Sequence, residues 1–145
     1  MLRLQIQVDP AAGDLPADRQ QIRRWVASAL ASLSVDAELV LRFVGEEEGK
    51  ALNRQFRKRN RPTNVLTFDY ASSPTVRADI VICMPVVRAE AARQGKRERD
   101  HLGHLVVHGV LHAGGHDHLD DDQAVRMEAL ETAILRRFAI PDPYA

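Results

Sequence analysis

The chain has 145 residues, of which 45% are hydrophobic, and its 20 Lys and Arg residues balance its 20 Asp and Glu residues. This length and hydrophobic content predict one globular domain over residues 1–145 with a core of its own. The zero net charge excludes a global electrostatic signal for nucleic acid, so any such signal must be local.

The N-terminal segment and the cysteine content indicate the compartment. Residues 2–8 alternate between apolar and polar side chains, and no stretch approaches the length of a membrane span. The sequence therefore predicts neither a signal peptide nor a membrane protein, and we expect a cytoplasmic protein. The single cysteine, Cys83, stands in an apolar run, which favours a buried core thiol over a nucleophile or a metal ligand.

The first half of the chain alternates between strand and helix patterns. Residues 2–8 and 37–44 show the period of two that is typical of strands. Residues 16–33 carry an apolar helical face, and residues 46–57 form a second helical pattern with acids in its first turn. Strand, helix, strand and helix in this order predict crossover connections and parallel pairing.

The second half predicts two more strands, at residues 64–68 and 79–84, with a turn or loop at 71–77 between them. Because no helix separates them, this pair can be antiparallel, with one strand at the sheet edge. Three helices follow: one from Pro85 to Gln94 that ends at Gly95, one that carries the histidines, and one that begins at Asp120 to Asp122. The predicted fold class is α+β, a mixed four-stranded sheet packed with helices.

All six histidines lie between positions 101 and 118. On a helix, residues four apart share one face, so His108 and His112 can direct their imidazoles at one point. Gly114 and Gly115 accept the left-handed conformation that ends helices, which lets the chain fold back and bring His118 to the same point. Three protein ligands with an open fourth position are typical of a catalytic zinc. The spacing predicts a zincin-like metal helix and loop.

The remaining histidines have less specific interpretations. His101 and His104 are expected to be packed and satisfied, since a lone histidine on an apolar helix usually is. His104 is at best an outer neighbour of the metal, because it lies two turns from His112. His116 competes with His118 for the third ligand position, and the glycine frame favours His118.

Gly109 stands where the zincin motif of metalloproteases has its glutamate base, which argues against a zinc protease. The residue that replaces this base is left open. Asp117 and His116 are candidates, but such residues more commonly order a loop or form hydrogen bonds to the side chains that bind the metal.

Five basic residues crowd into the eight positions from Arg54 to Arg61. Such a run is usually a solvated helix face. Here it occupies a helix end and a polar turn that enters a strand, and the planar fork of arginine is the favoured partner of phosphate oxygens. A zinc site beside these arginines would suit phosphodiester cleavage by a metal-activated water, with arginine offsetting charge in the transition state.

The string from His108 to His118, HGVLHAGGHDH, resembles the signature of the YbeY family of bacterial rRNA maturation factors, which are metal-dependent endoribonucleases. The segment from Asn53 to Phe68 is similar to a second hallmark of that family, and the segment from Ala78 to Cys83 to a third. The resemblance extends over nearly the whole chain, as far as Tyr144. Three positions depart from the family's usual residues. The family usually has Leu at the position of Ala113, an aromatic residue at that of His116, and Gly at that of Ala78.

The resemblance implies one Zn²⁺ per chain on His108, His112 and His118, a catalytic arginine at Arg57, and a single-strand-specific endoribonuclease that acts in 16S rRNA 3′-end maturation and ribosome quality control. The implied partner is RNA, above all the 16S rRNA precursor, with ribosomal proteins or an assembly GTPase as further candidates. The alternative is a ribosome-assembly binding protein whose zinc is mainly structural. The open fourth position and the glycine-turned loop favour the enzyme.

Overall fold

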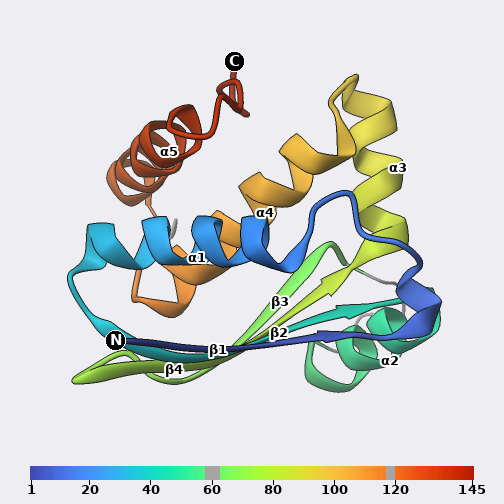
Figure 1. Cartoon of the computed structure of the whole chain (residues 1–145), viewed down its shortest axis with the longest axis horizontal. Coiled ribbons are helices and arrows are strands. Elements are labelled where there is room, and N and C mark those ends of the chain that lie inside the picture. Colours follow the sequence, from blue (N-terminus) through green and yellow to red (C-terminus); the bar gives the residue numbers. More distant parts are fainter. Residues whose placement is uncertain (58–62, 117–119) are drawn as a thin grey trace.

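The structure, a computed structural model, describes residues 1–57, 63–116 and 120–145 (Figure 1). These residues contain four strands, one short 3₁₀ helix and five α-helices. In chain order the elements are β1 (Leu2–Val8), η1 (Pro10–Ala12), α1 (Arg19–Leu33), β2 (Asp36–Val44), α2 (Glu46–Arg57), β3 (Val65–Ala71), β4 (Thr75–Cys83), α3 (Met84–Gln94), α4 (Glu98–Ala113) and α5 (Asp121–Arg136).

The four strands form one sheet in the order β1-β2-β4-β3. β1 pairs with β2 and β2 pairs with β4 in parallel, whereas the edge strand β3 pairs with β4 in antiparallel fashion. The helix between β1 and β2 returns the chain to the same end of the sheet, and the short turn between β3 and β4 reverses its direction. The predicted α+β fold with a mixed four-stranded sheet is confirmed.

The prediction of a turn or loop at residues 71–77 is wrong for most of these residues. β3 continues to Ala71 and β4 begins at Thr75, so only a three-residue turn joins the two strands. Thr75 and Val76 extend β4 because they continue its parallel ladder with β2, a contact between segments far apart in the chain. The hydroxyl of Tyr70 also donates a hydrogen bond to Asp79 across the hairpin, at 2.7 Å.

The first helix starts three residues later than expected. Asp18 caps it, because its carboxylate accepts a hydrogen bond from the backbone N–H of Gln21 at 2.7 Å. The expected helix that ends at Gly95 is confirmed, and Gly95 adopts the left-handed conformation with φ 64°. The last helix begins after Asp120, which caps it in the same way as Asp18 caps the first.

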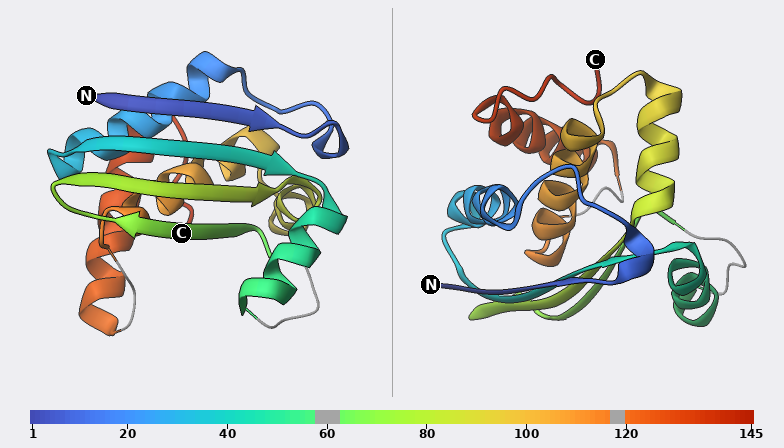
Figure 2. Two further views of the ribbon diagram at one scale, coloured as in Figure 1. Left: turned by 90° about the horizontal axis from the view of Figure 1, so that it is seen from below. Right: turned by 45° about the vertical axis from the view of Figure 1, so that its right-hand side comes forward.

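The helices cover the two faces of the sheet unequally. α1 and α4 pack on one face with α3 and α5 beside them, and α2 lies over one end of the opposite face (Figures 1 and 2). Because successive strand residues point to opposite faces, the sheet contributes to two cores. The larger core lies under α1 and α4 and contains Trp25, Phe43, Ile80, Leu102 and Leu111. The smaller core lies on the α2 side and contains Val44, Leu66, Val81 and Cys83, which confirms a buried thiol at Cys83.

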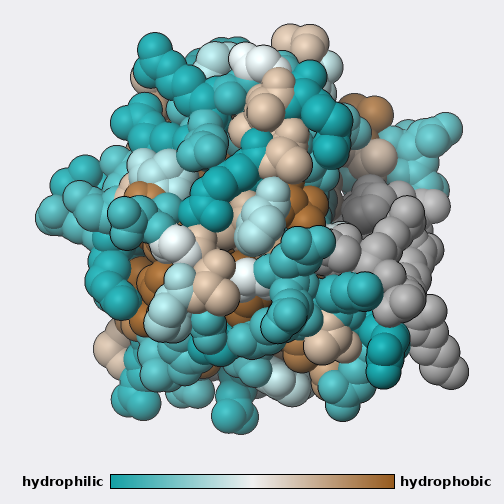
Figure 3. All heavy atoms as spheres, turned by 90° about the vertical axis from the view of Figure 1, so that its right-hand side faces the viewer, coloured by the Kyte–Doolittle hydropathy of each residue, from teal (hydrophilic) through white to brown (hydrophobic). Residues whose placement is uncertain are grey.

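The outer surface is polar where it is seen from the side of α3. Hydrophilic side chains cover most of the face that Figure 3 shows, and the hydrophobic areas between them are small and interrupted. Within residues 1–57, 63–116 and 120–145, no helix combines the length and the apolar character that a membrane span requires.

α4 is the central helix, in contact with β3, β4, α1, α3 and α5. Two glycines permit this close packing. A Cβ on Gly103 would lie 3.1 Å from the ring of Trp25, and one on Gly109 would lie 3.0 Å from Cγ2 of Ile80. Position 109 therefore faces the sheet, and a glutamate there would enter apolar packing. A glutamate at this position could not act as the base that it provides in zinc proteases without disrupting that packing.

Replacing Gly109 by Glu should lower the free energy of unfolding by about 3 kcal/mol or more, because a carboxylate would be forced against Ile80 and Val65. The matched variant Gly109→Ala adds one methyl group and gains about 1 kcal/mol of helix propensity, so it should remain within about 1 kcal/mol of wild type. Urea unfolding followed by circular dichroism measures both variants. If the Glu variant were as stable as the Ala variant, position 109 could not face the sheet.

Candidate metal centre

His108 and His112 lie one turn apart near the C-terminal end of α4, and both side chains are half-buried. His116, half-buried as well, lies in the turn after the helix, where its backbone N–H donates to the carbonyl of Leu111 at 3.0 Å. The predicted third ligand, His118, lies outside the described residues, as does Asp117. The structure thus places two members of the predicted ligand set and the competing third one.

The turn after α4 uses its two glycines for different reasons. Gly115 has φ 103°, which side chains rarely tolerate. Gly114 has φ −78°, an ordinary value, but a Cβ at this position would collide with Leu33 of α1. The expected left-handed conformation therefore occurs at Gly115, whereas a side chain at Gly114 would displace the end of the Leu33 side chain.

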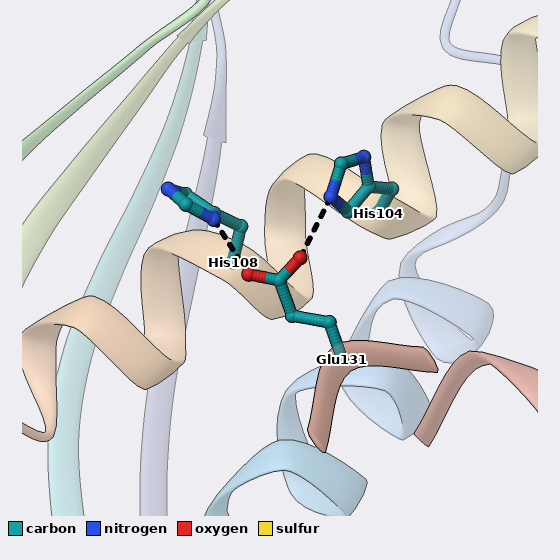
Figure 4. Close-up of side chains that lie close together, drawn as sticks. All are labelled: His104, His108 and Glu131. Carbon is teal, nitrogen blue, oxygen red and sulfur yellow. Dashed lines mark hydrogen bonds and ion pairs between the residues drawn. The ribbon is translucent and has the colours of Figure 1, made fainter. Parts of the chain in front are cut away.

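The carboxylate of Glu131, from α5, lies between two histidines of α4 (Figure 4). Glu131 is completely buried, with 0% of its surface exposed. Its Oε1 lies 2.7 Å from Nδ1 of His108, and its Oε2 lies 2.8 Å from Nε2 of His104. Tyr144, in the C-terminal segment, donates its hydroxyl to the same Oε2 at 2.5 Å. Three partners therefore surround one carboxylate.

Within the described ranges, His104, His108 and Glu131 form a group that could hold a metal ion, since one ligand atom from each lies within 4.8 Å of the others. Imidazole nitrogens and carboxylate oxygens suit zinc and several other transition metals. The junction of α4 and α5 thus has metal-binding donors, and His108 belongs both to this group and to the predicted ligand set. A cavity of about 250 Å³ adjoins it, lined by His108, Ala124, Met127, Glu128, Glu131 and Tyr144.

The partners of Glu131 control its charge. Burial raises the pKa of this carboxyl, but hydrogen bonds from His104, His108 and Tyr144 outweigh burial and lower the pKa to about 2. Glu131 is therefore ionised at neutral pH despite its burial. The effect on Tyr144 is opposite, because burial and the adjacent carboxylate raise the pKa of its hydroxyl, which stays protonated and remains a donor.

His101 lies nearer the N-terminal end of α4 and is 4% exposed, with its Nε2 3.0 Å from a carboxylate oxygen of Glu90 in α3. The side-chain amide of Asn64 donates to the same oxygen at 3.1 Å. This confirms the expectation that His101 is packed and hydrogen-bonded. His104 is likewise held by a carboxylate, that of Glu131, and it neighbours His108 at a ring-centroid distance of 6.1 Å.

The Nδ1 atoms of the histidines on α4 differ in whether they have hydrogen-bond partners. Nδ1 is buried without a hydrogen-bond partner among the described residues in His101, His104 and His112. An unsatisfied buried nitrogen costs about 1–3 kcal/mol, and of these three histidines only His112 belongs to the predicted ligand set. The imidazoles of His108 and His112, half-buried one turn apart, have the donor chemistry that fits a metal.

The predicted arginine cluster begins on α2. Arg54 is exposed on this helix, and Arg57 is its last residue. Phe56 packs edge-on against Phe68 of β3, with ring centroids 4.9 Å apart, whereas Val65 of β3 faces Gly109 of α4. The edge strand β3 therefore lies between the end of α2 and the histidine helix. The rest of the cluster, Lys58, Arg59 and Arg61, lies outside the described residues.

Comparison with known proteins identifies the family. A family model described as Endoribonuclease YbeY matches residues 7–139. The chain belongs to the YbeY family. Relatives named Endoribonuclease YbeY include a Bordetella pertussis protein that is 51% identical, with 99% of this chain and 96% of the relative covered. A Methylibium petroleiphilum relative is 46% identical over 100% of this chain and 95% of its own length.

A solved structure extends the comparison to the fold. The solution structure of a Thermotoga maritima protein matches with a TM-score of 0.63, covering 96% of this chain and 92% of that one. Because the two sequences are 23% identical, this likeness concerns the fold alone. It agrees with the α+β arrangement of this chain.

Glu131 and Tyr144 are not among the site residues that the sequence predicts. Glu131 does carry a signal, because it stands in the buried stripe of α5 with Met127, Ile134 and Leu135. A charged residue in such a stripe has to be paired. Tyr144 carries no comparable signal, since its position depends on how the C-terminal segment folds back after α5.

The lowered pKa of Glu131 predicts that the metal-free protein is sensitive to acid. A carboxyl whose pKa is lower in the folded chain than its ordinary value of 4.5 stabilises the fold above that value, and this contribution is lost as the pH falls toward about 2. Between about pH 5 and about pH 3, wild type should lose about 2 kcal/mol more than Glu131→Gln. Urea titrations at each pH measure the difference, and equal pH dependence of the two proteins would contradict it.

Proposed function

We propose that this chain is a zinc-dependent, single-strand-specific endoribonuclease that acts in 16S rRNA 3′-end maturation and ribosome quality control. Membership in the YbeY family supports the reaction class, because the relatives are named as endoribonucleases. The observation that carries the proposal is the position of His108 and His112, one turn apart at the end of α4 and directly before the turn that leads to His118.

In this proposal His108, His112 and His118 hold one Zn²⁺ per chain and leave a fourth position open. The half-buried side chains of His108 and His112 and the unpartnered Nδ1 of His112 support a cation there. A bound zinc supplies a Lewis acid and makes a coordinated water nucleophilic near neutral pH. The side chain of His108 is 26% exposed, so the site can be reached from solution.

Arg57 supplies the positive charge that phosphodiester cleavage requires. Its guanidinium can hold two phosphate oxygens at once and offset the negative charge that grows as the phosphorus is attacked. Arg57 lies at the end of α2, and Phe56 of the same helix packs against β3. The other face of β3 contacts α4, and this arrangement supports the role of Arg57. The basic neighbours of Arg57 would bind successive phosphates of a single strand without reading its sequence.

The same proposal places the protein in the cytoplasm, with precursor 16S rRNA as substrate and ribosomal proteins or an assembly GTPase as partners. It is tested by measuring the zinc content of the purified protein and its cleavage of an RNA with single-stranded and duplex segments. We expect about one zinc per chain, cuts in the single-stranded segments, loss of cleavage with a chelator, and recovery when zinc is restored. RNA binding without cleavage at full zinc occupancy would contradict the proposal and indicate an assembly protein with a structural zinc.

Alanine variants should separate ligands from packed histidines. Replacing His108, His112 or His118 by Ala should reduce the zinc content well below one ion per chain, because each removes one of three protein ligands. His101→Ala is the matched control on the same helix and should retain zinc, since His101 faces Glu90 of α3. Elemental analysis of each purified variant measures the outcome. Full occupancy in His118→Ala together with loss in His116→Ala would assign the third position to His116.

The variant Arg57→Lys retains the charge but loses the planar fork. We expect turnover to fall by about 10²–10³-fold, with zinc content and melting temperature close to wild type. Arg3→Lys is the control, because Arg3 is exposed on β1 at the opposite edge of the sheet from β3, and it should change turnover by less than about threefold. An Arg57→Lys protein that melts at a much lower temperature would assign Arg57 to the fold instead.

A further inference from the structure

Glu131 joins α4 and α5 through both of its carboxylate oxygens. Oε1 faces Nδ1 of His108, and Oε2 faces His104 and Tyr144 (Figure 4). An ionised carboxylate only accepts hydrogen bonds, so each of these groups has to present a proton to it. For His108 this requirement places the proton on Nδ1.

We propose that Glu131 is a positioning residue of the metal centre, which holds His108 in the tautomer and orientation that present Nε2 to the metal. In a neutral imidazole one nitrogen carries the proton, so a proton held on Nδ1 makes Nε2 the ligand atom. Nε2 lies on the side of the ring that points away from Glu131 (Figure 4). This inference rests on the proposed function, because it takes His108 to be a ligand.

The burial of Glu131 makes its contact with His108 favour one orientation of the His108 ring. If the ring of His108 turned over, a C–H group would face Oε1, and a buried acceptor would lose its donor where water does not reach. The side chain of His108 is itself 26% exposed, so this hydrogen bond adds to the orientation that packing provides. The ring is therefore oriented before a metal binds, and less conformational entropy is lost on binding.

His104 and Tyr144 hold the other oxygen of the carboxylate. Nε2 of His104 lies 2.8 Å and the hydroxyl of Tyr144 2.5 Å from Oε2, and the Tyr144 ring packs edge-on against His104 at a centroid distance of 5.3 Å. These contacts prevent Glu131 from rotating away from His108. The C-terminal segment thereby supports the metal centre, although it lies far from the histidines in sequence.

The same three residues could in principle bind a metal directly, through Nδ1 of His108, Nε2 of His104 and an oxygen of Glu131. Tetrahedral zinc with bonds of about 2 Å places its ligand atoms about 3.3 Å apart. Here the nitrogens lie 2.7 and 2.8 Å from two different oxygens, which is hydrogen-bond spacing. The geometry therefore favours support of His108 over direct ligation by Glu131, and a variant of His104 distinguishes the two.

The first experiment measures the zinc affinity of the full chain by competition with a chromophoric chelator. Glu131→Gln retains the size of the side chain but removes its charge, so we expect one zinc per chain at saturation with affinity weakened about 10–100-fold. Tyr144→Phe removes one of three donors to the carboxylate and should weaken binding by about fivefold or less. His104→Ala should still bind one zinc per chain, whereas His112→Ala should not.

The second experiment reads the tautomer of His108 by nitrogen-15 NMR, and its deciding measurement is made on wild type. Metal-free wild type should carry its ring proton on Nδ1, and this proton should remain when zinc is added. In Glu131→Gln the signal should indicate a mixture of tautomers, because the side-chain amide can donate as well as accept. A predominant Nε2–H tautomer in metal-free wild type would overturn the inference, whether or not the variants fold.

The outcomes separate this inference from the proposed function. Zinc loss in His104→Ala together with retention of zinc in His112→Ala would place the metal on the His104, His108 and Glu131 group and overturn the inference. Wild-type affinity and an unchanged tautomer in Glu131→Gln would also overturn it, while the proposed function would stand. Zinc binding that survives both His108→Ala and His112→Ala would contradict the proposed ligand set itself.

Discussion

α4 is packed against β3 and β4 and surrounded by α1, α3 and α5, so the histidines on it have to be satisfied inside that packing. A buried polar ring without a partner costs about 1–3 kcal/mol, and neighbouring helices supply the partners. Glu90 of α3 serves His101, and Glu131 of α5 serves His104 and His108. The positions of α3 and α5 thus depend on hydrogen bonds to carboxylates as well as on apolar contacts.

One side of α4 packs on the sheet, and another side carries histidines that form polar contacts. Gly109 faces the sheet, where even a methyl group would contact Ile80. The preceding residue, His108, points instead toward Glu131, because adjacent residues are separated by about 100° around the helix axis. A helix can therefore be deeply buried and still present imidazoles to one accessible side.

The edge strand β3 connects this helix with α2. Val65 packs toward Gly109 of α4, and Phe68 packs against Phe56 near the end of α2. Since β3 is the last strand of the sheet, elements from both faces can approach each other around it. The end of α2 and the helix α4 therefore both approach this edge of the sheet, although the two helices pack on opposite faces.

The sequence by itself determined the order of strands and helices, the mixed sheet, the buried Cys83 and the placement of His108 on one helix with His112, because periodicity and spacing are local properties of the chain. It could not determine the start of β4, which depends on pairing with β2. Nor could it reveal the role of Glu131, 23 residues from His108, because that contact exists only once α5 packs on α4. The ring nitrogen that His108 presents is therefore decided by the tertiary structure.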